Sequence, residues 1–222
     1  MEARYHVISH WETPASAYPR LSVGDWTIIS QQRGEGIYKM GDYGAFYYVP
    51  DSIGLTVIKE GATAWFTDEP RQMYALAEIG LFRARGHVLV GGLGLGLIHH
   101  FLRQNAAVES VTTVERAPEL ERLVWPHMAV GELITGDFYN AVPELAAAGR
   151  SFDTIITDFL FGYQDDANWK ALNEQRAFCR RHFPNAQFLE HSYQRWLDYE
   201  RAQNLLPAGV LGGMYDQVKI VR

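Results

Sequence analysis

The chain has 222 residues, a hydrophobic content of 47% and a formal net charge of −6. This length and composition predict one folded domain with an appended segment, and they argue against intrinsic disorder. The acidic balance argues against non-specific binding to nucleic acid, which depends on lysine and arginine side chains that displace counterions.

The single cysteine, Cys179, excludes an internal disulfide and is typical of a reducing compartment. No apolar stretch approaches the ~20 residues that span a bilayer, and the N-terminus lacks the apolar core of a signal peptide. We therefore expect a cytoplasmic protein with no membrane or nucleic-acid partner.

Residues 1–66 are predicted to form a small antiparallel β region, because short strands rich in β-branched and aromatic residues alternate with turn residues. Gly34 to Gly36 and Pro50 to Ser52 are typical turns between paired strands. The two expected hairpins join 26–30 to 37–40 and 45–49 to 55–58.

Aromatic side chains are frequent in this region, at Tyr43, Tyr47, Tyr48 and Trp65. Packing on one face of a sheet explains them simply. The alternative is a surface that covers a ligand cleft or forms a homodimer.

Residues 67–222 are predicted to form an α/β domain. Thr67 is a good N-cap, and Asp68, Glu69 and Pro70 suit a first helical turn. The apolar spacing that follows predicts a helix to about Phe82.

The next segment is the most informative. The apolar run 87–91 predicts a buried parallel strand, and glycines follow at Gly92, Gly94 and Gly96, where a helix opens. A dinucleotide fingerprint needs glycine where Leu97 stands, and a phosphate-binding loop needs a lysine that is missing. This favours a nucleoside bound through its sugar and an amino-acid tail. A tight strand–helix turn in another α/β protein stays the alternative.

Two further strands end in acids. Strand 110–115 ends at Glu115, roughly 20 residues after the glycines, where a carboxylate can bind both ribose hydroxyls. Strand 132–135 leads to Gly136, Asp137 and Phe138, where an acid can accept the amine of adenine and a ring can cover the base. Each acid alone could also be a helix cap.

The remaining chain alternates helices and strands. The predicted helices are 118–126, 142–148, 167–182 and 193–205, and the predicted strands are 155–158, 187–190, 210–211 and 214–221.

Four of these segments together resemble class I S-adenosylmethionine-dependent methyltransferases: 91–96, 114–120, 136–138 and 152–158. Segments 55–61 and 65–69 are similar to the hairpin and helix start of the spermidine-synthase-like branch. The resemblance covers about two-thirds of the chain. It implies an α/β fold with a Rossmann-like doubly wound sheet. Most strands would be parallel, with an antiparallel C-terminal edge and a small antiparallel β segment in front.

The resemblance also implies roles for individual residues. The cofactor, S-adenosyl-L-methionine, would be bound by Gly91, Gly92, Leu93, Gly94, Gly96, Glu115, Arg116, Asp137 and Phe138. Asp158, at a strand end, is the candidate base or amine anchor, unless it only caps a turn. Candidate substrate contacts are Trp65, Asp68, Phe159, Tyr163 and His191. We expect no metal site.

The chain departs from the family pattern at several places, three of which bear most on its function. Val90 stands where many class I enzymes carry the acid that binds the ammonium of the cofactor, and Leu95 where aminopropyltransferases carry an aspartate. The apolar run 159–161 replaces polar residues that a polyamine needs. The sequence thus favours a methyltransferase with a small acceptor. The alternatives are a polyamine aminopropyltransferase that uses decarboxylated S-adenosylmethionine and a non-catalytic protein that binds the nucleoside cofactor.

Overall fold

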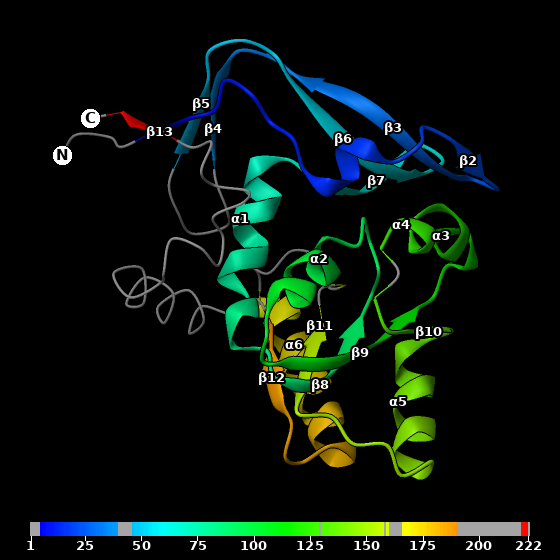
Figure 1. The fold of residues 1–222 in the computed structure, drawn as a ribbon. Coiled ribbons are helices and arrows are strands. Elements are labelled where there is room, and N and C mark those ends of the chain that lie inside the picture. Colours follow the sequence, from blue (N-terminus) through cyan, green and yellow to red (C-terminus); the bar gives the residue numbers. More distant parts are fainter. Residues whose placement is uncertain are drawn as a thin grey trace.

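The computed structural model describes residues 5–39, 46–128, 130–157, 159, 166–190 and 219–221. These residues form a five-stranded parallel sheet with helices around it and, on one side, two smaller sheets built mainly from the N-terminal strands (Figure 1). The α/β class and the separate antiparallel sheet agree with the prediction.

The parallel sheet has the order β10-β9-β8-β11-β12, and every neighbouring pair runs parallel. Its strands are β8 (Gly86–Gly91), β9 (Val108–Glu115), β10 (Glu132–Thr135), β11 (Thr154–Thr157) and β12 (Gln187–Leu189). The chain runs outward from β8 through β9 to β10 and then returns to the other side of β8. Ligands of such sheets bind beyond the carboxyl ends of the strands at this point of reversal.

Helices cover both faces of the parallel sheet. Successive side chains of a strand point to opposite faces. Val88 and Val90 of β8 join the core that holds Leu102 of α2, whereas Leu89 joins the core that holds Val142 of α5. The fold is therefore doubly wound. The helices that follow β8 are α2 (Leu97–Gln104), α3 (Pro118–Leu123), α4 (Trp125–Met128), α5 (Phe138–Ala147) and α6 (Asp166–His182).

The N-terminal strands form two sheets, and neither predicted hairpin exists. One sheet has the order β2-β3-β6-β7 and the other β13-β1-β5-β4. Strand β3 pairs with β6, and β4 pairs with β5, so residues 34–35 and 50–52 carry the chain from one sheet to the other. Turn residues mark a break in a strand, but the partner strand is chosen by long-range packing, which the local pattern does not contain. The strands are β1 (Tyr5–Val7), β2 (Ser22–Val23), β3 (Trp26–Arg33), β4 (Gly36–Lys39), β5 (Phe46–Val49), β6 (Ile53–Glu60), β7 (Thr63–Thr67) and β13 (Lys219–Val221).

The last strand also differs from the expected antiparallel edge of the parallel sheet. Strand β13 pairs with β1, antiparallel, in an N-terminal sheet. A three-residue strand carries no signal for its partner, and β1 offers an edge whose backbone groups need hydrogen bonds. The expected strands before residue 219 and the helix 193–205 lie outside the described residues.

The helix that connects the N-terminal strands to the parallel sheet is shorter than predicted. Strand β7 extends to Thr67, so helix α1 (Pro70–Glu78) begins later than expected. It ends before Gly80, whose φ of +82° is left-handed, and the 3₁₀ helix η2 (Leu81–Arg83) follows. A second 3₁₀ helix, η1 (Pro14–Ala17), lies near the N-terminus and was not predicted. No helix in the described part of the chain is long and apolar enough to cross a membrane.

Candidate functional site

A cavity of about 640 Å³ lies where β8, β9 and β10 end and the N-terminal strands pass over them. Its walls come from the loops after these three strands, from the helices α2, α3 and α5, from β3, β6 and β7, and from Phe159 after β11. The described residues that line it are Trp26, Ile58, Glu60, Trp65, Phe66, Gly92, Leu93, Gly94, Leu97, Ile98, Val114, Glu115, Arg116, Ala117, Pro118, Glu119, Leu120, Gly136, Asp137, Phe138, Tyr139 and Phe159.

The floor of the cavity is the glycine loop after β8. Gly92, Gly94 and Gly96 have φ angles of +91°, +52° and +71°, which L side chains rarely adopt. Gly96 is also the N-cap of α2. The glycine spacing in the sequence therefore reflects three left-handed turns of the backbone beneath the cavity.

Glu115, the last residue of β9, supports this loop from below. Its Oε2 accepts a hydrogen bond from the backbone N–H of Leu93 at 2.7 Å, and its Oε1 accepts one from Ala117 at 2.8 Å. The side chain is largely buried but lines the cavity. Each carboxylate oxygen has a second lone pair, so Glu115 can hold the loop and still accept hydrogen bonds from a ligand.

Asp137 caps a helix that starts earlier than the sequence predicts. Its Oδ1 accepts hydrogen bonds from the backbone of Tyr139 at 2.8 Å and of Asn140 at 3.3 Å, so α5 begins at Phe138 and not at Val142. The other oxygen, Oδ2, accepts no hydrogen bond within the described part of the chain. Asp137 is exposed and lines the cavity, which leaves Oδ2 for a ligand.

Aromatic rings form one end of the cavity. The rings of Phe138 and Phe159 lie 5.3 Å apart, and Tyr139 lies edge-on to both. The hydroxyl of Tyr139 accepts a hydrogen bond from Gln175 at 3.3 Å, and Gln175 in turn accepts one from Thr157 at the end of β11. Burial raises the pKa of Tyr139, so at neutral pH the phenol keeps its proton as a possible donor.

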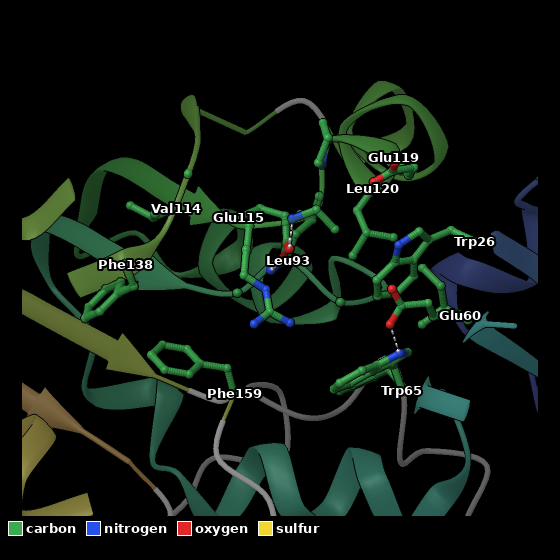
Figure 2. A pocket seen from close by; sticks show the side chains of 18 of the residues that line it. Trp26, Glu60, Trp65, Leu93, Val114, Glu115, Glu119, Leu120, Phe138 and Phe159 are labelled. Atoms are coloured by element: carbon green, nitrogen blue, oxygen red, sulfur yellow. Dashed lines mark hydrogen bonds between the residues drawn. The ribbon is translucent and has the colours of Figure 1, made fainter. Parts of the chain in front are cut away.

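The N-terminal strands form the opposite end. Figure 2 shows Trp26, Glu60 and Trp65 on one side of Glu115, with Phe138 and Phe159 on the other. The two indole rings stack at 6.0 Å, and Nε1 of Trp65 donates a hydrogen bond to Glu60 at 3.0 Å. Trp65 was a candidate from the sequence. Trp26 and Glu60 were not, because they face each other only through the long-range pairing of β3 with β6.

The cavity wall carries more negative than positive charge. Among the described lining residues, four are carboxylates, at Glu60, Glu115, Glu119 and Asp137, and one is a guanidinium, at Arg116. An anionic ligand would meet net repulsion here, and a positively charged one would be attracted.

Two predicted cofactor residues support the loop without lining the cavity. A Cβ on Gly91 would lie 2.6 Å from the ring of Phe159, and one on Gly96 would lie 2.3 Å from Cγ of Met128. An added Cβ at Gly91 would therefore overlap aromatic rings, and at Gly96 Met128 would have to shift and the positive φ also favours glycine. The other predicted cofactor residues all line the cavity, as do Trp65 and Phe159.

Asp68 was predicted to contact substrate, but it is not among the described residues that line the cavity. Its side chain is fully buried away from the cavity. Its carboxylate accepts hydrogen bonds from the hydroxyl of Thr13 at 2.5 Å and the backbone of Thr56 at 2.6 Å, and its carbonyl accepts one from the indole of Trp11. Burial raises the pKa of Asp68. Asp68, which was expected in the first turn of a helix, instead links the end of β7 to β6 and to the segment before η1.

Three other site candidates, Asp158, Tyr163 and His191, lie outside the described residues, and so does Tyr43.

Solved structures align with parts of this chain. The crystal structure of human Methyltransferase-like protein 13 in complex with SAH aligns over 53% of this chain and 61% of its own chain, with 17% sequence identity and a TM-score of 0.36. A putative SAM-dependent methyltransferase from Streptococcus mutans aligns over 70% of this chain and 44% of its own, with 14% identity and a TM-score of 0.43. The chain thus spans less than two-thirds of either structure. No protein-family model and no curated protein matches the sequence.

Proposed function

We propose that this protein is an S-adenosylmethionine-dependent methyltransferase that acts on a small acceptor. One observation carries the proposal: a left-handed glycine loop, a strand-end glutamate and an Asp-Phe pair follow three successive parallel strands and line one cavity. This is the arrangement that a ligand made of adenine, ribose and an amino-acid tail requires, because each part meets a group of suitable chemistry.

The residues fit the cofactor part by part. The adenine ring suits the aromatic end, with its amine toward Oδ2 of Asp137. The ribose hydroxyls suit the carboxylate of Glu115, and the methionine part suits the open backbone at Gly92 and Gly94. When bound, the cofactor supplies an electrophilic methyl group next to a positive sulfur. The protein's task is to hold an acceptor close to that group and in line with it.

The charge of the cavity bears on the acceptor. Four carboxylates against one guanidinium favour a neutral or positively charged acceptor over an anionic one. The end formed by Trp26, Glu60 and Trp65 offers aromatic faces beside a carboxylate, which suit an alkylammonium group. We place the acceptor in the part of the cavity that the cofactor leaves open.

A polyamine aminopropyltransferase is the second candidate, because it would use the same cavity with decarboxylated S-adenosylmethionine. One buried side chain counts against it. Leu95, where aminopropyltransferases carry an aspartate, is fully buried in the core and does not line the cavity. A non-catalytic protein that binds the cofactor is the third candidate.

Calorimetry with three ligands separates these candidates. We expect S-adenosylmethionine and S-adenosylhomocysteine to bind, and decarboxylated S-adenosylmethionine to bind more weakly. Preference for the decarboxylated compound would favour the aminopropyltransferase, and no binding of any of the three would refute the proposal. Transfer of labelled methyl to a panel of small amines and neutral acceptors then tests for turnover. Binding without transfer would favour the non-catalytic protein.

A further inference from the structure

Each residue of the loop from Leu93 to Gly96 is held by a different element. Glu115 accepts the N–H of Leu93. The ring of Phe66, on β7, faces Gly94, and Met128, on α4, packs against Gly96. The carbonyl of Leu95 accepts a hydrogen bond from Tyr18. Two of these four contacts come from the N-terminal strands and their connections, far from the loop in sequence.

Of these four contacts, the one made by Tyr18 joins the two residues that are furthest apart in the sequence. It is the C-cap of η1 and is buried, with 5% of its surface exposed. Its hydroxyl lies 3.0 Å from the carbonyl oxygen of Leu95 and 2.6 Å from Sδ of Met128, and its ring stacks on His127 at 4.9 Å. A phenol has one proton, and a carbonyl is a stronger acceptor than a thioether. The hydrogen bond therefore goes to Leu95.

We propose that Tyr18 is a positioning residue for cofactor binding: its hydroxyl fixes the peptide group of Leu95 and so sets the shape of the glycine loop before the cofactor arrives. This inference rests on the proposed function, because it assigns the loop to S-adenosylmethionine.

The loop needs such a contact because of its composition. Leu95 lies between Gly94 and Gly96, both left-handed, and glycine can rotate into many other conformations. Leu95 is fully buried, so its carbonyl must find a partner inside the protein. The carbonyl group also fixes the peptide plane that carries the N–H of Gly96, which donates to Leu93. A loop held in its bound shape loses less entropy when a ligand binds.

Tyr18 is itself held firmly. Its backbone carbonyl accepts a hydrogen bond from Arg20 at 2.8 Å, and Thr13 caps η1 while it donates to the buried carboxylate of Asp68. Burial raises the pKa of Tyr18, and the negative charge of Asp68 raises it further. The hydroxyl therefore keeps its proton at neutral pH and can donate a hydrogen bond. The N-terminal segment thus presents a fixed donor to the cofactor loop.

The test compares Tyr18→Phe with a matched control. Tyr47→Phe makes the same change at another buried tyrosine, which lies on β5 and does not line the cavity. For each variant, calorimetry gives the affinity for S-adenosylmethionine and for adenosine, urea denaturation gives stability, and hydrogen exchange of the ligand-free protein reports on the amides of residues 94–98.

Tyr18→Phe is expected to weaken S-adenosylmethionine binding about threefold to tenfold, the size of one hydrogen bond, and adenosine binding less. The amides of 94–98 should exchange faster. Tyr47→Phe should keep wild-type affinity and exchange. If Tyr18→Phe lowers stability but leaves both affinities unchanged, its role is only structural and the inference is wrong. If the wild type binds no S-adenosylmethionine, the proposed function fails instead, and faster exchange at 94–98 would still show that Tyr18 holds the loop.

Discussion

A methyl group added at Gly94 tests whether the glycine loop holds the cofactor. Gly94 has a φ of +52°, and a Cβ there would lie 3.5 Å from the ring of Phe66, an ordinary contact. Gly94→Ala therefore fits the ligand-free protein without a clash and narrows the cavity between the loop and Phe66. Alanine is preferred to valine, because a β-branched residue is severely strained at positive φ and its extra carbons would press on Phe66.

The cost in stability can be worked out separately from the cost in binding. A left-handed conformation costs an L residue roughly 1–2 kcal/mol. Replacing glycine regains about 0.4–1 kcal/mol by restricting the unfolded chain. The net loss is about 1 kcal/mol in the free energy of unfolding. A methyl group forced against a bound ligand costs a further 1–3 kcal/mol, which lowers affinity roughly 5- to 150-fold.

Gly149→Ala is the matched control. Gly149 follows α5 with a φ of +74°, and nothing lies within 4 Å of the position of its Cβ. It has the same backbone strain as Gly94 but does not line the cavity. Both variants should lose similar stability in urea, and only Gly94→Ala should lose affinity for S-adenosylmethionine by calorimetry. Wild-type affinity in a folded Gly94→Ala protein would refute the assignment of this loop.

Three further predictions concern buried charged or titratable groups. Glu115→Gln replaces one acceptor oxygen by an amide that faces a backbone N–H, so S-adenosylmethionine affinity should fall by about 1.5–3 kcal/mol in calorimetry; an unchanged affinity would place the ribose elsewhere. Burial lowers the pKa of His99 to about 4, so the unfolded chain binds a proton first as the pH falls from 6.5 to 4. Stability in urea should drop by ~3 kcal/mol over this range from this group, a drop that His99→Gln should remove and His10→Gln, at an exposed site, should not. Asp68→Ala leaves two buried donors without their acceptor and should lower the free energy of unfolding by about 2–4 kcal/mol, whereas wild-type stability would contradict its joining role.

The parallel sheet and the strand-end acids could be predicted because their signals are local. A buried parallel strand is a continuous apolar run, as at 88–90, and the sheet edge where ligands bind follows directly from the strand's direction. Glu115 is the last residue of β9, and Asp137 comes two residues after the end of β10. Their place in one cavity then depends only on neighbouring strands being parallel, which the alternation of strands and helices predicts.

The N-terminal half could not be predicted in the same way. Trp26 and Glu60 form one end of the cavity because they are directly opposite in the register of β3 and β6, 34 positions apart along the chain. Tyr18 reaches Leu95 through tertiary packing alone. Asp68 has the local pattern of a helix start, but the extension of β7 to Thr67 places it in the core. The residue types and their spacing in the sequence do not predict these long-range contacts.

The fold explains why the chain has apolar residues at two positions, 90 and 95, where the similar enzymes carry acids. Val90 and Leu95 are fully buried in the same hydrophobic core as α2, so an acid at either position would bury an unpaired charge at a cost of several kcal/mol. The negative charge of the cavity comes instead from Glu60 on β6 and Glu119 on α3, in addition to Glu115 and Asp137. The N-terminal half of the chain thus supplies both the hydrogen-bond donor to the glycine loop, from Tyr18, and part of the charge of the cavity, from Glu60.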